Sequence, residues 1–119
     1  MDYKRSIWEL NGGIAVEHFA PLSPAEKPSF LFAHGNFCGS WCWHNLLAYF
    51  SSRGANAYAV NYRGHWLSRG HGKLGDATAE DYIHDLETAL SAIGEEVILV
   101  GHSMGGVVAQ KVAEGRKLK

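Results

Sequence analysis

The chain has 119 residues, of which 46% are hydrophobic, and this length and composition fit one modest globular domain with a single core. Its 11 basic and 12 acidic side chains leave a formal net charge of −1 and form no basic stripe, so we expect no nucleic-acid partner. No apolar run approaches the length of a membrane span, so we expect no membrane partner. With no visible secretory signal and only two cysteines, a reduced, cytoplasmic location is expected.

The N-terminal segment is predicted to form a β-hairpin. Two short apolar stretches, 7–10 and 14–19, flank Asn11-Gly12-Gly13, whose residues accept the positive φ of a tight turn. All three prolines fall within 21–28, which is predicted to be a loop.

Strands and helices are then predicted to alternate. The expected strands are 29–33, 57–61 and 96–100, and the expected helices are 41–52, 78–93 and 104–113. Thr78 to Asp81 resembles a capping box at the start of the second helix. The alternation predicts a three-layer α/β/α fold, with a mainly parallel sheet after the N-terminal hairpin.

The most informative motif is Gly101-His102-Ser103-Met104-Gly105, which matches the pattern Gly-x-Ser-x-Gly. A serine hydroxyl is a weak nucleophile, so it needs a base beside it and donors for the oxyanion that develops. The two glycines permit a sharp turn around Ser103, and the motif lies between a buried strand and a helix. This setting indicates that Ser103 is a catalytic nucleophile.

Two further motifs precede the serine motif. Phe32-Ala33-His34-Gly35 is followed by Trp41-Cys42-Trp43, and Asn61-Tyr62-Arg63-Gly64-His65 follows the next strand. With these three motifs in order, the chain resembles the N-terminal part of the α/β-hydrolase family over nearly its whole length. It departs from the family where Asn61 replaces an aspartate and Trp66 replaces a glycine.

The resemblance implies the remaining site residues. Backbone N–H groups of Met104 and Asn36 would form the oxyanion hole, and Phe37 would line the substrate pocket. His34 is expected to order its loop rather than act as the base, and the ring of His102 should project away from the hydroxyl of Ser103.

The other ionisable side chains are expected to have no part in catalysis. We expect Asp81 and Asp85 to be helix-start and surface charges, and His65, His71 and His84 to be solvated. The spacing of His34, Cys38, Cys42 and His44 also permits a zinc site, but it fits no common zinc motif, and the cysteines suit small apolar positions. We expect no metal.

The resemblance implies that residues 1–119 are the N-terminal part of one α/β-hydrolase domain. The 16 residues after Ser103 contain no histidine and one acid, Glu114, so the triad acid and histidine would lie outside this chain. The implied function is cofactor-free hydrolysis of a small ester, thioester or lactone through an acyl-enzyme. Haloperoxidase and carbon–carbon bond hydrolase activities, or a catalytically inactive fragment, remain alternatives. We also expect self-association through an uncovered edge of the strand at 96–100.

Overall fold

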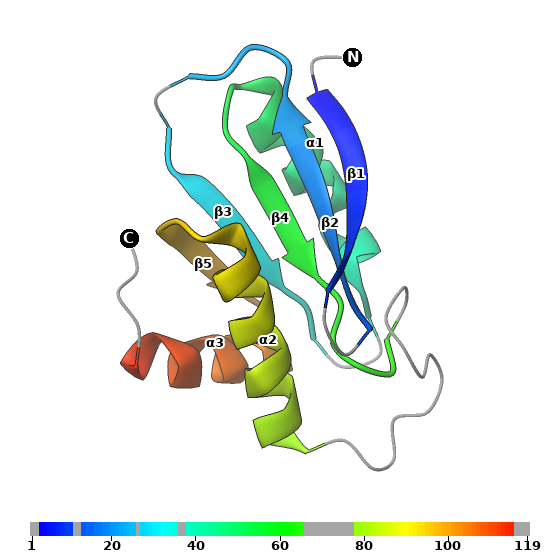
Figure 1. The fold of residues 1–119 in the computed structure, drawn as a ribbon, viewed down its shortest axis with the longest axis vertical. Coiled ribbons are helices and arrows are strands. Elements are labelled where there is room, and N and C mark those ends of the chain that lie inside the picture. Colours follow the sequence, from blue (N-terminus) through cyan, green and yellow to red (C-terminus); the bar gives the residue numbers. More distant parts are fainter. Residues whose placement is uncertain (1–2, 11–12, 26, 36–37, 66–77, 116–119) are drawn as a thin grey trace.

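A five-stranded mixed sheet is the centre of the fold (Figure 1). The computed structural model describes residues 3–10, 13–25, 27–35, 38–65 and 78–115. The strands of this part of the chain are β1 (Tyr3–Leu10), β2 (Ile14–Pro21), β3 (Ser29–Ala33), β4 (Ala57–Val60) and β5 (Val97–Gly101). They lie in the order β1-β2-β4-β3-β5.

The strand directions confirm the predicted α/β fold. The hairpin strands β1 and β2 are antiparallel, and β2 is also antiparallel to β4. β3 lies parallel to both β4 and β5. β1 begins at Tyr3, four residues before the predicted start, because its pairing with β2 continues to the register Tyr3↔Pro21 even though Lys4 and Arg5 are exposed. Gly13 has φ 74°, as the hairpin turn requires, whereas Asn11 and Gly12 lie outside the described residues.

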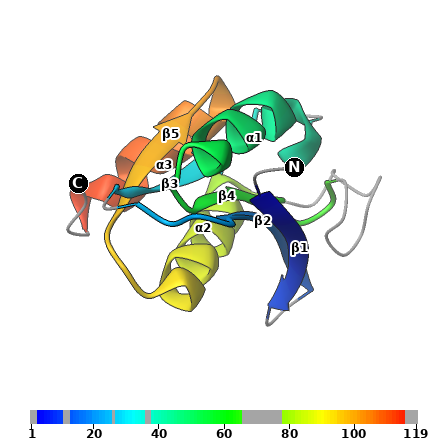
Figure 2. The same ribbon diagram turned by 90° about the horizontal axis from the view of Figure 1, so that it is seen from above.

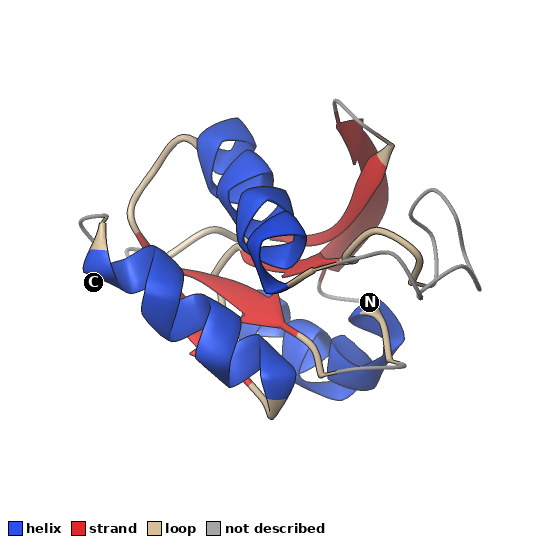
Figure 3. Cartoon of the chain, turned by 90° about the horizontal axis from the view of Figure 1, so that it is seen from below, coloured by secondary structure: helices blue, strands red, loops and turns tan. Residues whose placement is uncertain are grey.

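Helices cover both faces of the sheet, as predicted (Figures 2 and 3). They are the 3₁₀ helix η1 (Ser40–Trp43) and the α-helices α1 (His44–Ser52), α2 (Ala79–Ile93) and α3 (Met104–Glu114). α1 buries Leu47 against Phe19 and Phe32 on one face of the sheet. α2 and α3 bury Leu86 and Val108 against the other face, so one sheet separates two apolar cores.

The start of α2 is fixed by the predicted capping box. The Thr78 hydroxyl accepts the Asp81 N–H, and the Asp81 carboxylate accepts the Thr78 N–H. The helix ends at Gly94, whose φ of 74° places it in the left-handed region.

The expectation that Asp85 is a surface charge and that His65 is solvated is wrong, because both residues are buried. Asp85 is fully buried on the inner face of α2, and it accepts the Arg63 backbone N–H at 2.8 Å and its Nη2 at 2.8 Å. Arg63 also lies 3.4 Å from Asp81. His65 is buried among the rings of His34, Tyr62 and Tyr82. Together these contacts attach the start of the loop after β4 to α2.

β5 is the last strand at its end of the sheet. Within the described part of the chain it pairs only with β3, and its central residues Ile98, Leu99 and Val100 are only half-buried. The uncovered edge that the sequence predicted is therefore present among the described residues.

Candidate active site

Ser103 lies on a sharp turn between β5 and α3. Its φ of 57° and ψ of −122° make it the one non-glycine residue of the described chain with a positive φ. Such a conformation costs about 1–3 kcal/mol and persists only where its surroundings enforce it. Here the His102 N–H donates to the Ala33 carbonyl at 3.2 Å, and the Gly106 N–H donates to the Ser103 carbonyl at 2.9 Å. The Ser103 side chain is exposed at the tip of this turn.

Three glycines make this close approach of backbones possible. A Cβ at Gly101 would lie 2.6 Å from the Gly105 carbonyl oxygen, and one at Gly105 would overlap the Ala33 carbonyl oxygen. A Cβ at Gly35 would lie 3.2 Å from the Cβ of Ser103. The loop after β3 therefore packs directly against the serine turn: Gly101 and Gly105 have no room for a side chain, and Gly35 has room only for a tight contact with Ser103.

A cavity of about 570 Å³ opens above Ser103. Its lining comes from the serine turn, from the end of β3 and from η1 with the loop before it: His34, Gly35, Cys38, Trp41, Cys42, Trp43, His102 and Ser103. Met104 is the first residue of α3, where a backbone N–H has no acceptor within its own helix. Asn36 and Phe37, the other predicted site residues, lie outside the described residues.

His34 is held as a neutral ring. The Tyr62 N–H donates to its Nε2 at 3.3 Å, so the proton is on Nδ1, which donates to the Gly35 carbonyl at 2.6 Å. Burial, together with the nearby His65, lowers the pKa of His34 to about 4. Because both ring nitrogens are engaged, His34 is suited to ordering its loop, as expected, and not to accepting a proton from Ser103.

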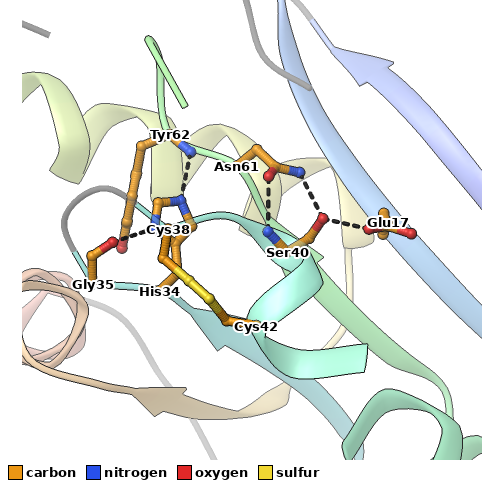
Figure 4. The surroundings of a disulfide bond; sticks show 8 residues. All are labelled: Glu17, His34, Gly35, Cys38, Ser40, Cys42, Asn61 and Tyr62. Atoms are coloured by element: carbon orange, nitrogen blue, oxygen red, sulfur yellow. Dashed lines mark hydrogen bonds between the residues drawn. A yellow bond between two sulfur atoms is a disulfide. The ribbon is translucent and has the colours of Figure 1, made fainter. Parts of the chain in front are cut away.

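A buried polar network holds η1 in place (Figure 4). Asn61 accepts the Ser40 N–H at 2.8 Å, and its Nδ2 donates to the Ser40 hydroxyl at 3.1 Å and to the Ala15 carbonyl at 3.3 Å. The Ser40 hydroxyl donates in turn to Glu17. The asparagine at position 61, where the family has an aspartate, thus has a structural reason. Its Nδ2 donates the hydrogen bonds to the Ser40 hydroxyl and the Ala15 carbonyl, and a carboxylate could donate neither.

Glu17 is a buried residue of this network that could not be recognised in the sequence analysis as a support of the site. It is 2% exposed on β2, where it accepts hydrogen bonds from Ser40, from His44 Nε2 at 2.7 Å and from Arg5 at 3.3 Å. Burial alone would raise the pKa of Glu17, but the hydrogen bonds from Ser40 and His44 outweigh it, so the pKa is below the ordinary value. The signal in the sequence that could have revealed this buried carboxylate is the position of Glu17 in the centre of the apolar stretch 14–19.

Cys38 and Cys42 form a disulfide in the cavity wall, with their Cα atoms 6.5 Å apart (Figure 4). The expectation of two reduced, apolar side chains is therefore wrong for this structure. The zinc alternative is not favoured either, because both ring nitrogens of His34 and the Nε2 of His44 are hydrogen-bonded to other partners. Among the residues that the structure describes, no three histidine, cysteine or acidic side chains gather as a metal site would require.

A comparison with known protein families finds one whose members match most of this chain. The alpha/beta hydrolase family matches residues 30–118, which include the loop after β3 and the serine turn. The chain belongs to the alpha/beta hydrolase family.

Individual relatives of this alpha/beta hydrolase chain are plant esterases. It is 34% identical over 91 residues to Esterase PIR7B of Oryza sativa subsp. japonica, covering 72% of this chain and 33% of that protein. It is 34% identical over 92 residues to Methylesterase 7 of Arabidopsis thaliana, covering 74% of this chain and 35% of that protein.

Solved structures agree with the fold. The epoxide hydrolase VrEH1 from Vigna radiata superposes with a TM-score of 0.74 at 25% identity, covering 97% of this chain and 36% of that one. The chain therefore spans about a third of the length of the relatives it matches. None of its described helices has the length and apolar character to cross a membrane.

Proposed function

We propose that this chain carries the nucleophile of a hydrolase that acts on small ester-like substrates through an acyl-enzyme, and that residues 1–119 are the N-terminal part of one α/β-hydrolase domain. The single observation that carries the proposal is the strained, exposed Ser103 at the floor of an aromatic-walled cavity. The Ser103 oxygen would attack the substrate carbonyl, and the Met104 and Asn36 N–H groups would donate to the oxyanion.

Serine chemistry favours esters over epoxides. Attack of Ser103 on an epoxide carbon would form an ether, which water does not cleave under mild conditions. Attack on a carbonyl forms an acyl-serine, which is itself an ester and is released by a water molecule. The residue at the turn thus favours the reaction class of the esterase relatives over that of the epoxide hydrolases, whose likeness to this chain is one of fold.

The relatives' names narrow the substrate class further. Several of them are called methylesterases, and one from Vitis vinifera is called methyl jasmonate esterase 1. We infer that the substrates are small carboxylic esters, methyl esters foremost, with thioesters and lactones as chemical neighbours. The cavity walls fit an apolar acyl group, since Trp41 and Trp43 contribute aromatic surface beside Ser103. No cofactor is needed for this chemistry.

The general base would come from outside these 119 residues. No histidine follows Ser103, and His34 is neutral and held at both nitrogens. The same observation favours a second candidate, a chain that folds as this family does but does not turn over substrate by itself.

An active-site fluorophosphonate probe tests the nucleophile directly. In the intact protein that supplies the base, wild type and the control Ser91→Ala, which changes an exposed serine on α2, should label with equal rates. Ser103→Ala should not label. Equal labelling of Ser103→Ala and wild type would disprove the assignment of the nucleophile. Labelling of Ser103 without release of product from a chromogenic methyl ester would favour the second candidate.

A further inference from the structure

One oxygen of Glu17 holds both ends of η1. Its Oε1 accepts a hydrogen bond from the hydroxyl of Ser40, the first residue of η1. The same oxygen accepts a hydrogen bond from Nε2 of His44, the residue that follows η1, at 2.7 Å. We call these two hydrogen bonds the η1 ties. Glu17 is only 2% exposed, so water competes little for them.

The three residues between the η1 ties all line the cavity above Ser103. They are Trp41, Cys42 and Trp43. Trp43 also packs on Phe32 of the sheet, with the ring centroids 4.9 Å apart. Trp41 is 50% exposed, so the sheet fixes its orientation less than that of Trp43. The position of Trp41 in the cavity wall therefore depends mainly on how η1 is held.

Asn61 directs the first of these ties. Its Oδ1 accepts the Ser40 N–H at 2.8 Å, and its Nδ2 donates to the Ser40 hydroxyl at 3.1 Å (Figure 4). Because the hydroxyl oxygen is an acceptor for Asn61, its single proton is free to be donated to Glu17. The contacts from Asn61 through Ser40 and Glu17 to His44 thus reach from one end of η1 to the other.

The exposed half of Trp41 is apolar surface that a bound ligand can cover. Removal of apolar surface from water favours binding in proportion to the area removed. An ester with a large apolar acyl group covers more of this ring than an acetyl ester does. A shift of η1 would therefore weaken the binding of large acyl groups more than that of small ones.

We propose that Glu17 is a positioning residue for substrate recognition: through the η1 ties it keeps Trp41 in the cavity wall, where Trp41 selects esters with large apolar acyl groups. The proposal rests on the proposed function for the ester chemistry. Glu17 is not one of the described residues that line the cavity, so it acts through η1. The chemical step at Ser103 does not depend on it.

Steady-state kinetics of the intact protein on two methyl esters test the proposal. Methyl phenylacetate has a large apolar acyl group, and methyl acetate has a small one. Ser40→Ala removes one η1 tie and Glu17→Leu removes both. Each should raise the KM for methyl phenylacetate by roughly 3- to 30-fold, with kcat and the constants for methyl acetate within about twofold of wild type. Glu17→Gln keeps an acceptor oxygen for both ties and should stay near wild type.

Two comparisons separate positioning from a general loss of structure. Ser51→Ala removes another fully buried hydroxyl, which donates to the Leu47 carbonyl at 2.7 Å, and it should leave the ester preference unchanged. In Trp41→Ala the preference should already be lost, so the further change Ser40→Ala should not alter it. Urea titration gives the conditions in which each variant is folded, and Ser40→Ala is the milder variant if Glu17→Leu does not fold.

A ligand that cannot be hydrolysed makes the test independent of catalysis. Benzyl ethyl ketone, the ketone isostere of methyl phenylacetate, is titrated into the intact protein carrying Ser103→Ala. The same titration is made with Ser40→Ala or Trp41→Ala added. Each added substitution should raise the Kd by roughly 3- to 30-fold, and the two together should raise it no further than Trp41→Ala alone.

The outcomes separate this proposal from the proposed function. An unchanged ester preference in Ser40→Ala and Glu17→Leu, an equal loss for both esters, or additive effects of Ser40→Ala and Trp41→Ala overturns positioning by Glu17. Absence of ketone binding in every variant also overturns it. Hydrolysis of neither ester by wild type is a failure of the proposed function alone, because ketone binding still decides whether the η1 ties position Trp41.

Discussion

Restoring the family's aspartate at position 61 should destabilise this chain, and Glu17 should be the cause. In Asn61→Asp, the side chain loses the donor that serves the Ala15 carbonyl and the Ser40 hydroxyl. It also places a second carboxylate on a hydroxyl that already donates to Glu17. Ser40 has one hydroxyl proton, so it cannot satisfy both carboxylates.

The size of the expected destabilisation follows from the Ser40 hydroxyl, which both carboxylates would contact. Two carboxylate oxygens in contact with one hydroxyl oxygen are separated by at most two hydrogen-bond lengths, about 6 Å. At an effective dielectric constant of about 20, two negative charges at this separation repel by about 3 kcal/mol. Both sites are buried, with Glu17 2% and Asn61 0% exposed, so solvent screening reduces this value little.

A double-mutant cycle isolates this repulsion. The free energies of unfolding of wild type, Asn61→Asp, Glu17→Gln and the double variant are measured by urea titration at pH 7. The destabilisation of Asn61→Asp should be about 2–3 kcal/mol smaller when residue 17 is glutamine. In the single variant, repulsion raises the folded pKa values of the two carboxylates above those that each would have without the other, so the destabilisation relative to wild type should shrink as the pH falls and the carboxylates are protonated. A coupling below about 0.5 kcal/mol would refute the reasoning.

Four further predictions concern other contacts. Gly35→Ala should slow fluorophosphonate labelling of Ser103 by roughly tenfold with little change in melting temperature, because its Cβ would lie 3.2 Å from that of Ser103. Asp85→Asn should lower the free energy of unfolding by about 2–4 kcal/mol in a urea titration, since the buried negative partner of Arg63 is lost and an NH2 donor replaces one of its two accepting oxygens. Glu17 has a lowered folded pKa, so its stabilisation is present above the unfolded pKa near 4.5 and is lost as the pH falls through the folded value. Glu17→Gln should therefore flatten the loss of stability between about pH 5 and 3, and an unchanged acid profile would count against the network. Light scattering of the isolated chain should show concentration-dependent association through the uncovered edge of β5; a monomer at all concentrations would contradict this.

The order of elements and the serine turn could be predicted because their causes are local. Apolar periodicity marks the strands and helices, and the glycines around Ser103 mark the sharp turn within five residues of sequence. The N-terminal extension of β1 was not predictable in this way, because its first residues are exposed and only the backbone of β2 holds them.

The burial of Asp85 could have been predicted, although the sequence analysis assigned it to the surface. It lies three residues after Tyr82 and four before Ala89, so helical geometry places it on the face that those core residues share. A carboxylate on an apolar helix face needs a buried partner, and Arg63 is that partner.

The network around η1 depends instead on contacts distant in sequence. Glu17 meets Ser40 and Asn61 meets Ser40 only after β2, β4 and η1 have packed. The spacing of four between Cys38 and Cys42 suits a metal site, a disulfide or two apolar residues equally well, so only the path of the loop between β3 and η1 decides among them.

The surroundings of Ser103 therefore depend on elements well outside its own motif. The segment 38–42 is held at Ser40, whose hydroxyl donates to Glu17 on β2 and whose N–H donates to Asn61 after β4. The serine motif is local in sequence, but the position of η1 in the cavity wall beside it is set by a carboxylate on β2 and an amide after β4.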